Sequence, residues 1–191
     1  MNNHFLLVHR AALLFMAFFV ASCQSLSGNN NQDANNHERS LRVVIQDNVL
    51  TSRIKKQIKT HASLFKGSDV VVKAYQGVVL MIGQVPTQSA KDTLTAISEG
   101  MDGAASTHNH TQISGKRSIK QKMNDGLLAL KVRNAIAKND DTLFTKVITL
   151  ANNNSIYFMG SVTRNEADIT IDIIKQVPDI ERVVKVFTYI D

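Results

Sequence analysis

Hydrophobic positions along the chain repeat with two different periods, and these periods predict its helices and strands. Apolar residues return every three or four positions in four stretches, which predicts amphipathic helices at 47–60, 87–99, 123–138 and 163–176. Alternating or continuous apolar runs bounded by turn residues predict strands at 70–74, 78–85, 104–113, 146–151, 155–162 and 182–190. The predicted order is helix, strand, strand, helix, strand, and it occurs twice.

A repeated motif indicates that one module has been duplicated. Residues 77–85 and 154–162 each contain a turn residue, an apolar run and then Gly-x-Val, at an offset of 77 positions. Asp47 and Asp125 hold the same place in the two copies, and the offset stays between 76 and 78 elsewhere. We therefore predict an α+β protein of two tandem αββαβ modules, 40–116 and 117–191. Each should have a three-stranded mixed sheet with two helices on one side.

Residues 1–22 have the layout of a secretory signal. A polar start carrying Arg10 precedes an apolar block at 11–21, and these eleven residues fall well short of the roughly 20 that span a bilayer. The block ends in Val-Ala-Ser-Cys, which resembles the lipobox of bacterial lipoproteins. That resemblance implies cleavage before Cys23 and acylation of Cys23, the only cysteine in the chain. An ordinary signal peptide that is cut elsewhere is the alternative.

The residues after Cys23 predict a tether and a location. Residues 24–37 contain five Asn and one large apolar side chain, a composition that cannot bury a core, so 23–39 is predicted to be an acylated, flexible linker. In lipoproteins of the enteric type, an Asp after the acylated cysteine tends to retain the protein in the inner membrane. By resemblance, Gln24 favours the outer membrane.

The duplicated unit behind a lipobox is similar to the dual BON-domain lipoproteins of Gram-negative bacteria. The resemblance is carried by the strand motif x-Gly-Val-x-Leu-x-x-Gly-x-Val and by the αββαβ order. It implies binding of anionic phospholipid, a role in outer-membrane integrity, no catalysis and no cofactor. The first module departs from the family pattern at 103–106, Gly-Ala-Ala-Ser, where a valine-rich strand usually begins. We expect that module to be a spacer or an interaction platform.

The first helix of the second module is the predicted lipid site. Its inward stripe is Leu128, Val132 and Ile136, which leaves two leucines on another face beside polar and basic residues. Surplus leucines next to lysines fit docking at a membrane interface, and the resemblance assigns lipid contact to this helix. The alternative is that the leucines pack against the first module. The candidate residues are Leu127, Leu130, Lys131, Asn134 and Lys138.

Two further apolar surfaces suggest contacts with protein. Ile169 and Ile173 lie off the expected inward stripe of their helix, and they would serve a scaffold for envelope assembly or division machinery. That scaffold is the alternative function. The strand at 78–85 is apolar on both faces, which favours contact between two modules that are each marginally stable alone. Binding of a protein partner by this sheet is the alternative, and it would serve the same scaffold.

Charge and motif content narrow the function classes. The net charge of +6 is mild and spread over both modules, and an exported protein of this kind meets anionic lipid rather than nucleic acid. A basic cluster on the first helix fits a solvated face as well as an anionic contact: Arg53, Lys55, Lys56 and Lys59. His108 and His110 alternate on a strand without acidic or cysteine ligands nearby, so no metal site and no enzyme are predicted. Some relatives carry haemolysin labels, but a pore-forming segment is missing, and membrane disruption ranks last.

Overall fold

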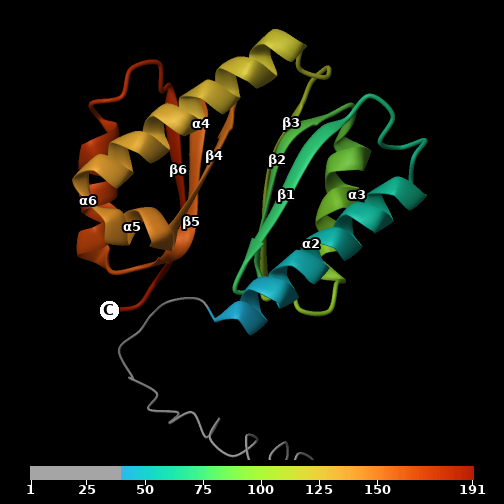
Figure 1. Ribbon diagram of the computed structural model, residues 1–191. Coiled ribbons are helices and arrows are strands. Elements are labelled where there is room, and N and C mark those ends of the chain that lie inside the picture. The colour runs from blue at the N-terminus through green and yellow to red at the C-terminus, as the bar shows by residue number, and fades with distance from the viewer. Residues whose placement is uncertain (1–39) are drawn as a thin grey trace, which may run out of the picture. The chain divides into compact units, whose positions relative to one another are not determined.

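The computed structural model describes residues 40–191, in which two modules of the predicted order follow one another (Figure 1). The first module consists of α2 (Leu41–Thr60), β1 (Asp69–Tyr75), β2 (Val78–Val85), α3 (Gln88–Glu99) and β3 (Ser106–Ile113). The second consists of α4 (Ile119–Asn139), α5 (Asp141–Lys146), β4 (Val147–Asn152), β5 (Ser155–Val162), α6 (Arg164–Ile174) and β6 (Arg182–Tyr189). No helix within residues 40–191 is long and apolar enough to cross a membrane.

Each module contains one mixed sheet of three strands, as predicted. The central strand, β2 or β5, pairs antiparallel with the strand before it and parallel with the strand after the intervening helix. Tight turns close both hairpins, with positive φ at Gln76 and Gly77 in one and at Asn153 and Asn154 in the other. Two consecutive residues with positive φ are the requirement of a type I′ turn, which matches the twist of antiparallel strands.

The glycine of each Gly-x-Val motif lies where the neighbouring strand crosses closely. A Cβ on Gly83 would clash with the carbonyl oxygen of Asp69, and one on Gly160 would lie 2.5 Å from the carbonyl oxygen of Lys146. Gly83 also has a φ of +117°, which side chains disfavour. These two glycines therefore mark close approaches between neighbouring strand backbones.

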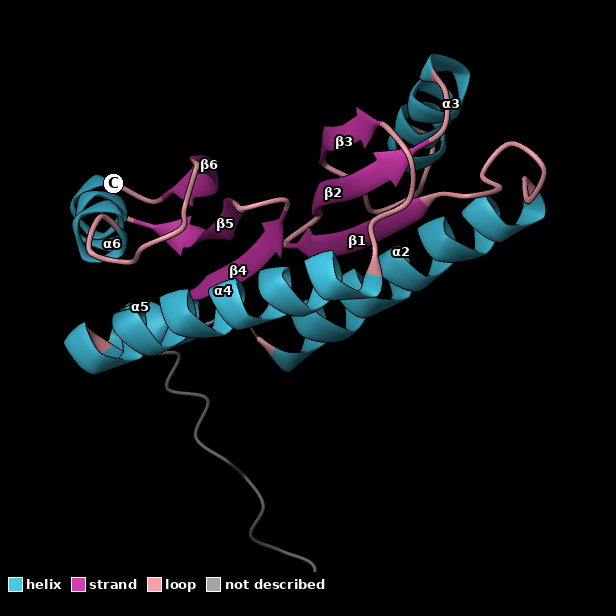
Figure 2. Ribbon diagram, turned by 90° about the horizontal axis from the view of Figure 1, so that it is seen from above, coloured by secondary structure: helices cyan, strands magenta, loops and turns pink. Residues whose placement is uncertain are grey.

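The helices cover one face of each sheet. In the first module, α2 runs along β1 (Figures 1 and 2), and Leu50 and Ile54 of α2 join Leu94 of α3 in a core against Val79 and Met81 of β2. In the second, α4 runs along β4 and contributes the predicted stripe of Leu128, Val132 and Ile136.

The opposite faces of the two sheets meet each other. Leu80 and Ile82 of β2 form one buried cluster with Tyr157 and Met159 of β5 and Val186 of β6. This confirms that the strand apolar on both faces serves contact between the modules. Side-chain hydrogen bonds accompany the cluster: Gln84 Nε2 to Asn152 Oδ1 at 3.2 Å, Asn153 Nδ2 to Gln112 Oε1 at 3.1 Å, and Ser161 Oγ to Gln76 Oε1 at 2.6 Å.

Several element boundaries differ from the predicted ones. Both long helices begin earlier, because Ser40 and Ser118 cap them. Helix α5 was not predicted: Asp140 accepts hydrogen bonds from Thr142 N and Leu143 N, so a stretch taken for a loop becomes a helical turn that buries Leu143. The second module therefore has three helices rather than two.

The predicted exposed position of Ile173 is wrong. Ile173 belongs to the core of the second module, whereas Ile169 remains 37% exposed. The inward stripe of α6 runs through Ala167, Thr170, Ile173 and Ile174, and Ile171 is only partly buried. Thr170 occupies an inward position because its hydroxyl donates to the carbonyl oxygen of Glu166 at 2.8 Å, and this buried polar residue obscured the phase of the helix.

Candidate functional site

The predicted leucines of α4 lie on its outward face and are exposed to solvent. Leu127 is 56% exposed and Leu130 is 53% exposed, so the alternative that they pack against the first module is wrong. Lys131, Asn134 and Lys138 are also exposed. The structure thus brings all five candidate residues to the accessible side of one helix.

The apolar ridge of α4 is longer than the sequence indicated. Ile119 is 80% exposed and Met123 is 62% exposed, and they continue the spacing of Leu127 and Leu130 towards the start of the helix. We missed Ile119 because the predicted helix began at Met123. The signal that could have found it is the capping box formed by Ser118 and Gln121, in which Ser118 N donates to Gln121 Oε1 at 2.8 Å.

A groove of about 500 Å³ lies against this face of α4. Four predicted residues line it, namely Leu127, Leu130, Lys131 and Asn134, whereas Lys138 lies outside it. The remaining lining comes from α4, from the β4–β5 turn and from the segment before β6: Asn124, Leu128, Asn154 and Asp179. Apolar, amide and charged groups therefore converge on one surface.

The basic group of the groove is available to a ligand. Lys131 Nζ lies 3.4 Å from Asp179 Oδ2, but the two side chains are 54% and 69% exposed. Exposed pairs of this kind contribute at most about 1 kcal/mol, so an anionic group can compete for the ammonium. Lys138 makes none of the ion pairs found within residues 40–191.

Buried charges hold α4 against the hairpin that forms the other wall. Asp125 Oδ1 accepts from Asn154 N at 3.3 Å, and Asp125 Oδ2 accepts from Arg117 Nη1 at 2.6 Å. Arg117 Nε also donates to Asp69 Oδ2 in the first module at 3.0 Å. Burial raises the pKa of Asp69, but hydrogen bonds and charges from Lys122 and Arg117 outweigh burial and hold that pKa below its usual value.

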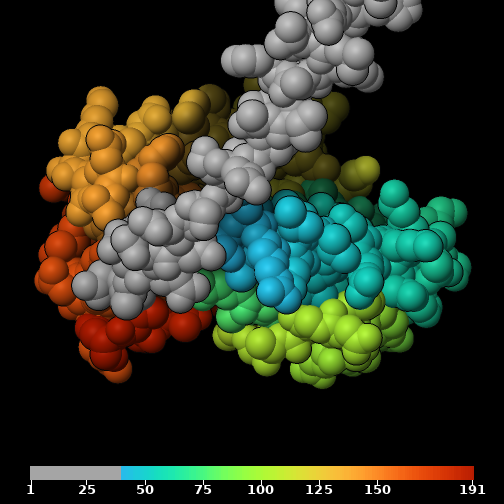
Figure 3. Space-filling view, turned by 60° about the horizontal axis from the view of Figure 1, so that its bottom comes forward, coloured from blue at the N-terminus to red at the C-terminus, as the bar shows by residue number. Residues whose placement is uncertain are grey.

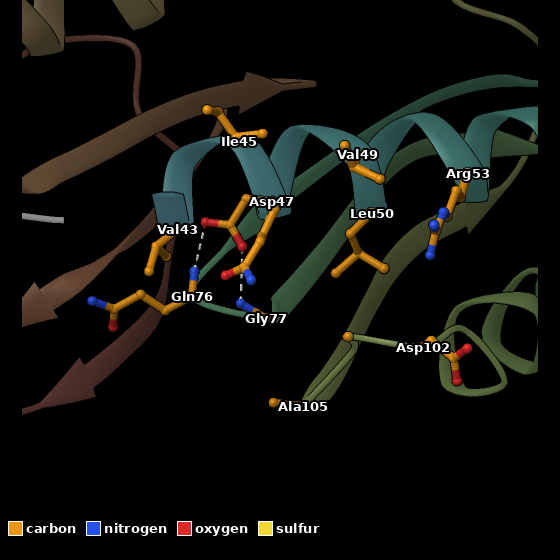
Figure 4. Close-up of a pocket in the computed structure, with 12 residues that line it drawn as sticks. Val43, Ile45, Asp47, Val49, Leu50, Arg53, Gln76, Gly77, Asp102 and Ala105 are labelled. Carbon is orange, nitrogen blue, oxygen red and sulfur yellow. Dashed lines mark hydrogen bonds between the residues drawn. The ribbon is translucent and has the colours of Figure 1, made fainter. Parts of the chain in front are cut away.

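The first module has a corresponding groove, which we did not predict (Figure 4). Asp47 Oδ2 accepts from Gln76 N at 2.8 Å and Asp47 Oδ1 accepts from Gly77 N at 3.0 Å, as Asp125 does for its own hairpin. The groove measures about 650 Å³, and its walls are α2, the β1–β2 turn and the segment before β3. The duplication could have revealed it, because an offset of 78 places Val49 at Leu127 and Arg53 at Lys131.

The two strand histidines stack on each other beside a tyrosine ring. His108 and His110 stack with ring centroids 6.5 Å apart, and the His110 ring lies 5.7 Å from that of Tyr157. Burial lowers the pKa of His110, and the nearby charges of His108 and Arg182 lower it further. Within residues 40–191, no three His, Cys, Asp or Glu side chains are grouped so that they could hold a metal ion. Cys23 and Gln24 lie outside the described residues.

Comparison with known proteins identifies the module. The profile of the BON domain matches residues 46–115 and again residues 124–191. The chain belongs to the BON-domain family. The two matched stretches coincide with the two αββαβ modules, so the predicted family and fold class are confirmed, and each groove lies on the first helix of a BON domain.

Two curated relatives match over most of the chain. Outer membrane lipoprotein DolP of Haemophilus influenzae is 30% identical over 147 residues, which cover 77% of this chain and 76% of the relative. The 21 kDa hemolysin of Actinobacillus pleuropneumoniae is 26% identical over 152 residues, which cover 80% and 78% of the two chains. Among solved structures, the C-terminal domain of CdsD from the Type III secretion system of Chlamydia trachomatis matches at 10% identity, with 74% and 98% of the chains covered and a TM-score of 0.31, which supports no inference.

The most exposed apolar residues of α2 and α4 lie outside the two stretches that match the BON domain. Leu41 and Ile45 precede the first matched stretch, and Ile119 and Met123 precede the second. These four side chains, 62% to 81% exposed, lie on N-terminal extensions of α2 and α4 beyond the matched BON core.

Proposed function

We propose that this BON-domain protein is a lipid-anchored envelope protein that faces the periplasm and binds anionic phospholipid without catalysis. Through this binding it would support the integrity of the outer membrane. The observation that carries the proposal is the outward face of α4, where Leu127 and Leu130 are more than half exposed beside Lys131 and Lys138. Apolar side chains beside basic ones on a helix are the usual composition of a surface that rests at a membrane interface.

The energy of such docking fits a reversible contact. Burying a whole leucine side chain contributes about 1.5–3 kcal/mol, so two half-exposed leucines together add about the same amount as one whole side chain, about 1.5–3 kcal/mol. Each lysine at an anionic surface adds about 1 kcal/mol. This total orients a protein on a membrane without holding it there permanently. A separate anchor would be needed for stable attachment.

The acyl groups proposed for Cys23 provide that anchor. The lipobox resemblance at 20–23 and the printed name of the Haemophilus influenzae relative, an outer membrane lipoprotein, both support it. Gln24 favours the outer membrane over the inner one. The names of both relatives describe a lipoprotein and a hemolysin rather than an enzyme, which supports a role without catalysis.

Replacing Leu127 by Asp tests the lipid site. A soluble form that begins at Gln24 should float with vesicles that contain phosphatidylglycerol, less so at high salt, and should not float with purely zwitterionic vesicles. Leu127→Asp should lower that binding about tenfold or more, because it removes apolar area and adds a negative charge. Since Leu127 is 56% exposed, thermal unfolding should be nearly unchanged.

Ile169→Asp is the matched control, since Ile169 is also an exposed apolar residue on a helix of the same domain. Flotation of this variant should equal that of the parent protein. If Leu127→Asp floats as well as the parent protein, the assignment of lipid binding to α4 is wrong. If the parent protein floats with neither kind of vesicle, phospholipid binding itself is wrong.

A protein-binding scaffold for envelope assembly or division machinery is the second candidate function. Ile169 is the residue that supports it, because it is a 37% exposed isoleucine in the middle of α6. Ile173, the other residue of the predicted interaction surface, lies in the core, so Ile169 is the one predicted residue that remains exposed there. Binding to a protein partner should be indifferent to lipid headgroups, which separates the two functions.

A further inference from the structure

We propose that α2 of the first BON domain is a second membrane-docking helix, with the anionic surface of the anchoring membrane as its occupant. This inference rests on the lipid anchor of the proposed function but not on the site in α4. The first domain would then be a membrane contact in its own right rather than a spacer.

The outward face of α2 is an apolar ridge. Leu41 is 81% exposed, Ile45 is 62% exposed and Val49 is 44% exposed, and their spacing of four residues places them on one side of the helix. The opposite side buries Leu50 and Ile54. Figure 4 shows Ile45 directed away from Leu50 and from the hairpin that Asp47 binds. Helix α2 lies on the surface of the protein (Figure 3, cyan).

The charge of α2 complements an anionic surface. The helix contains five basic residues, Arg42, Arg53, Lys55, Lys56 and Lys59, and a single acidic one, Asp47. Asp47 is buried and accepts two backbone hydrogen bonds from the hairpin, so its charge is not presented outwards. None of the ion pairs within residues 40–191 includes a basic residue of α2.

A shallow depression beside the ridge brings apolar and basic side chains of α2 together. A depression of about 390 Å³ is lined by Ile45, Val49, Arg53 and Lys56 together with Asn48 and Ser52. Its apolar residues lie towards the start of the helix and its basic residues towards the middle. A phospholipid surface offers both matching components, acyl chains for the isoleucine and valine and phosphates for the cations.

The position of α2 in the chain favours the membrane over other anionic partners. Seventeen residues, 24–40, separate Cys23 from the first residue of α2. A chain of that length spans at most about 60 Å even when fully extended. The start of α2 is therefore the part of the described structure closest along the chain to the proposed acyl groups, and docking there is intramolecular once Cys23 is anchored.

Tryptophan reporters test the two helices separately, because the chain contains no tryptophan. The soluble form beginning at Gln24 is suitable, since all three hydrophobic clusters lie within residues 50–187. With phosphatidylglycerol vesicles, emission from Ile45→Trp should shift to the blue and resist an aqueous quencher. Ile113→Trp, at the end of the first module's sheet that is far from the Gln76–Gly77 turn, is the matched control, and its emission should not shift.

Charge variants add a second measurement. Arg53→Gln should weaken vesicle partitioning about fivefold, the factor equivalent to about 1 kcal/mol for one basic residue at an anionic surface. Ile45→Asp should weaken it further, and circular dichroism should show an unchanged fold because Ile45 is exposed. Val49→Asp provides a second substitution on the same ridge.

The outcomes separate the two proposals. If Leu127→Trp shifts with vesicles but Ile45→Trp does not, docking by α2 is wrong and the proposed function stands. If Ile45→Trp shifts and Leu127→Trp does not, α2 is confirmed and the α4 site is wrong. If neither tryptophan shifts its emission and the protein does not float with vesicles, both proposals, docking by α2 and docking by α4, are wrong. A shift of Ile45→Trp with an added envelope protein but not with vesicles overturns the membrane as occupant of α2.

Discussion

At the scale of single residues, the backbone of the neighbouring strand leaves no room for a side chain at the glycine of each Gly-x-Val repeat. Gly83 combines a positive φ with a Cβ position that the carbonyl oxygen of Asp69 occupies, and Gly160 is crowded in the same way by Lys146. The duplicated motif is therefore preserved within this chain by backbone packing. It carries no chemistry of a binding site.

Replacing Gly83 by Ala should destabilise the protein by about 2–4 kcal/mol, because a methyl group there forces either strand β1 or the φ angle to move. Gly126→Ala is the matched control. Gly126 is exposed on α4 with no atom within 4 Å of its Cβ position, so alanine there should stabilise by about 0.5–1 kcal/mol. Urea unfolding of both variants measures the two changes, and equal signs would contradict the close-approach argument.

The residues of the candidate site differ in how well the sequence predicts their exposure. The five α4 residues could be chosen from the sequence because the core stripe of that helix is regular, so Leu127 and Leu130 stood out as surplus. Ile173 could not be placed, because a buried Thr170 interrupts the apolar period of α6. Periodicity identifies a face only when its buried positions are apolar.

At the scale of the elements, caps determined where the prediction succeeded and where it fell short. Thr87 caps α3 and the Thr163–Glu166 capping box opens α6, at the positions where the predicted helices 87–99 and 163–176 begin. The starts of α2 and α4 were missed because their first turns point apolar residues outwards, which breaks the inward pattern used to find helices. The same outward residues, Ile45 and Ile119 among them, are the ones that a membrane would contact.

Replacing Ser118 by Ala should fray the first turns of α4. The change removes the hydroxyl that accepts from Gln121 N at 3.2 Å, at a cost of about 1 kcal/mol. Hydrogen exchange should rise at 119–124 and remain slow at the buried Leu128. Ser114→Ala, an exposed serine outside the helix, is the control and should leave exchange at 119–124 unaltered. Unchanged protection in Ser118→Ala would show that the cap does not hold the extension.

At the scale of the whole molecule, the two BON domains are joined by packing and by charge. The buried cluster around Leu80, Tyr157 and Met159 could be anticipated from an apolar strand with two buried faces. The charge network could not, since Asp69 lies 48 residues before Arg117 and neither belongs to a recognisable motif. Arg117 is only 7% exposed and contacts one carboxylate from each domain.

This network gives the molecule a defined acid sensitivity. Because Lys122 and Arg117 hold the folded-state pKa of Asp69 below the usual 3.8, the unfolded chain binds a proton at Asp69 more readily than the folded one. The stabilisation from Asp69 is therefore complete above about pH 5 and is lost as the pH falls below 3.8 through the folded pKa. Glu166, whose pKa is lowered by Lys146 and by the capping box despite burial, acts in the same direction within the second domain alone.

Asp69→Asn should flatten the loss of stability between about pH 5 and pH 2, measured by urea unfolding at a series of pH values. Near pH 7 the variant should be less stable than the parent, because a neutral amide leaves the buried Arg117 with a weaker partner. Glu166→Gln is the matched control: it should also reduce the acid slope, but the ion pair of Arg117 with Asp69 should persist in it. An acid profile of Asp69→Asn that parallels the parent's would mean that Asp69 has an ordinary pKa. The charges around Arg117 would then contribute to the domain contact without making it sensitive to acid.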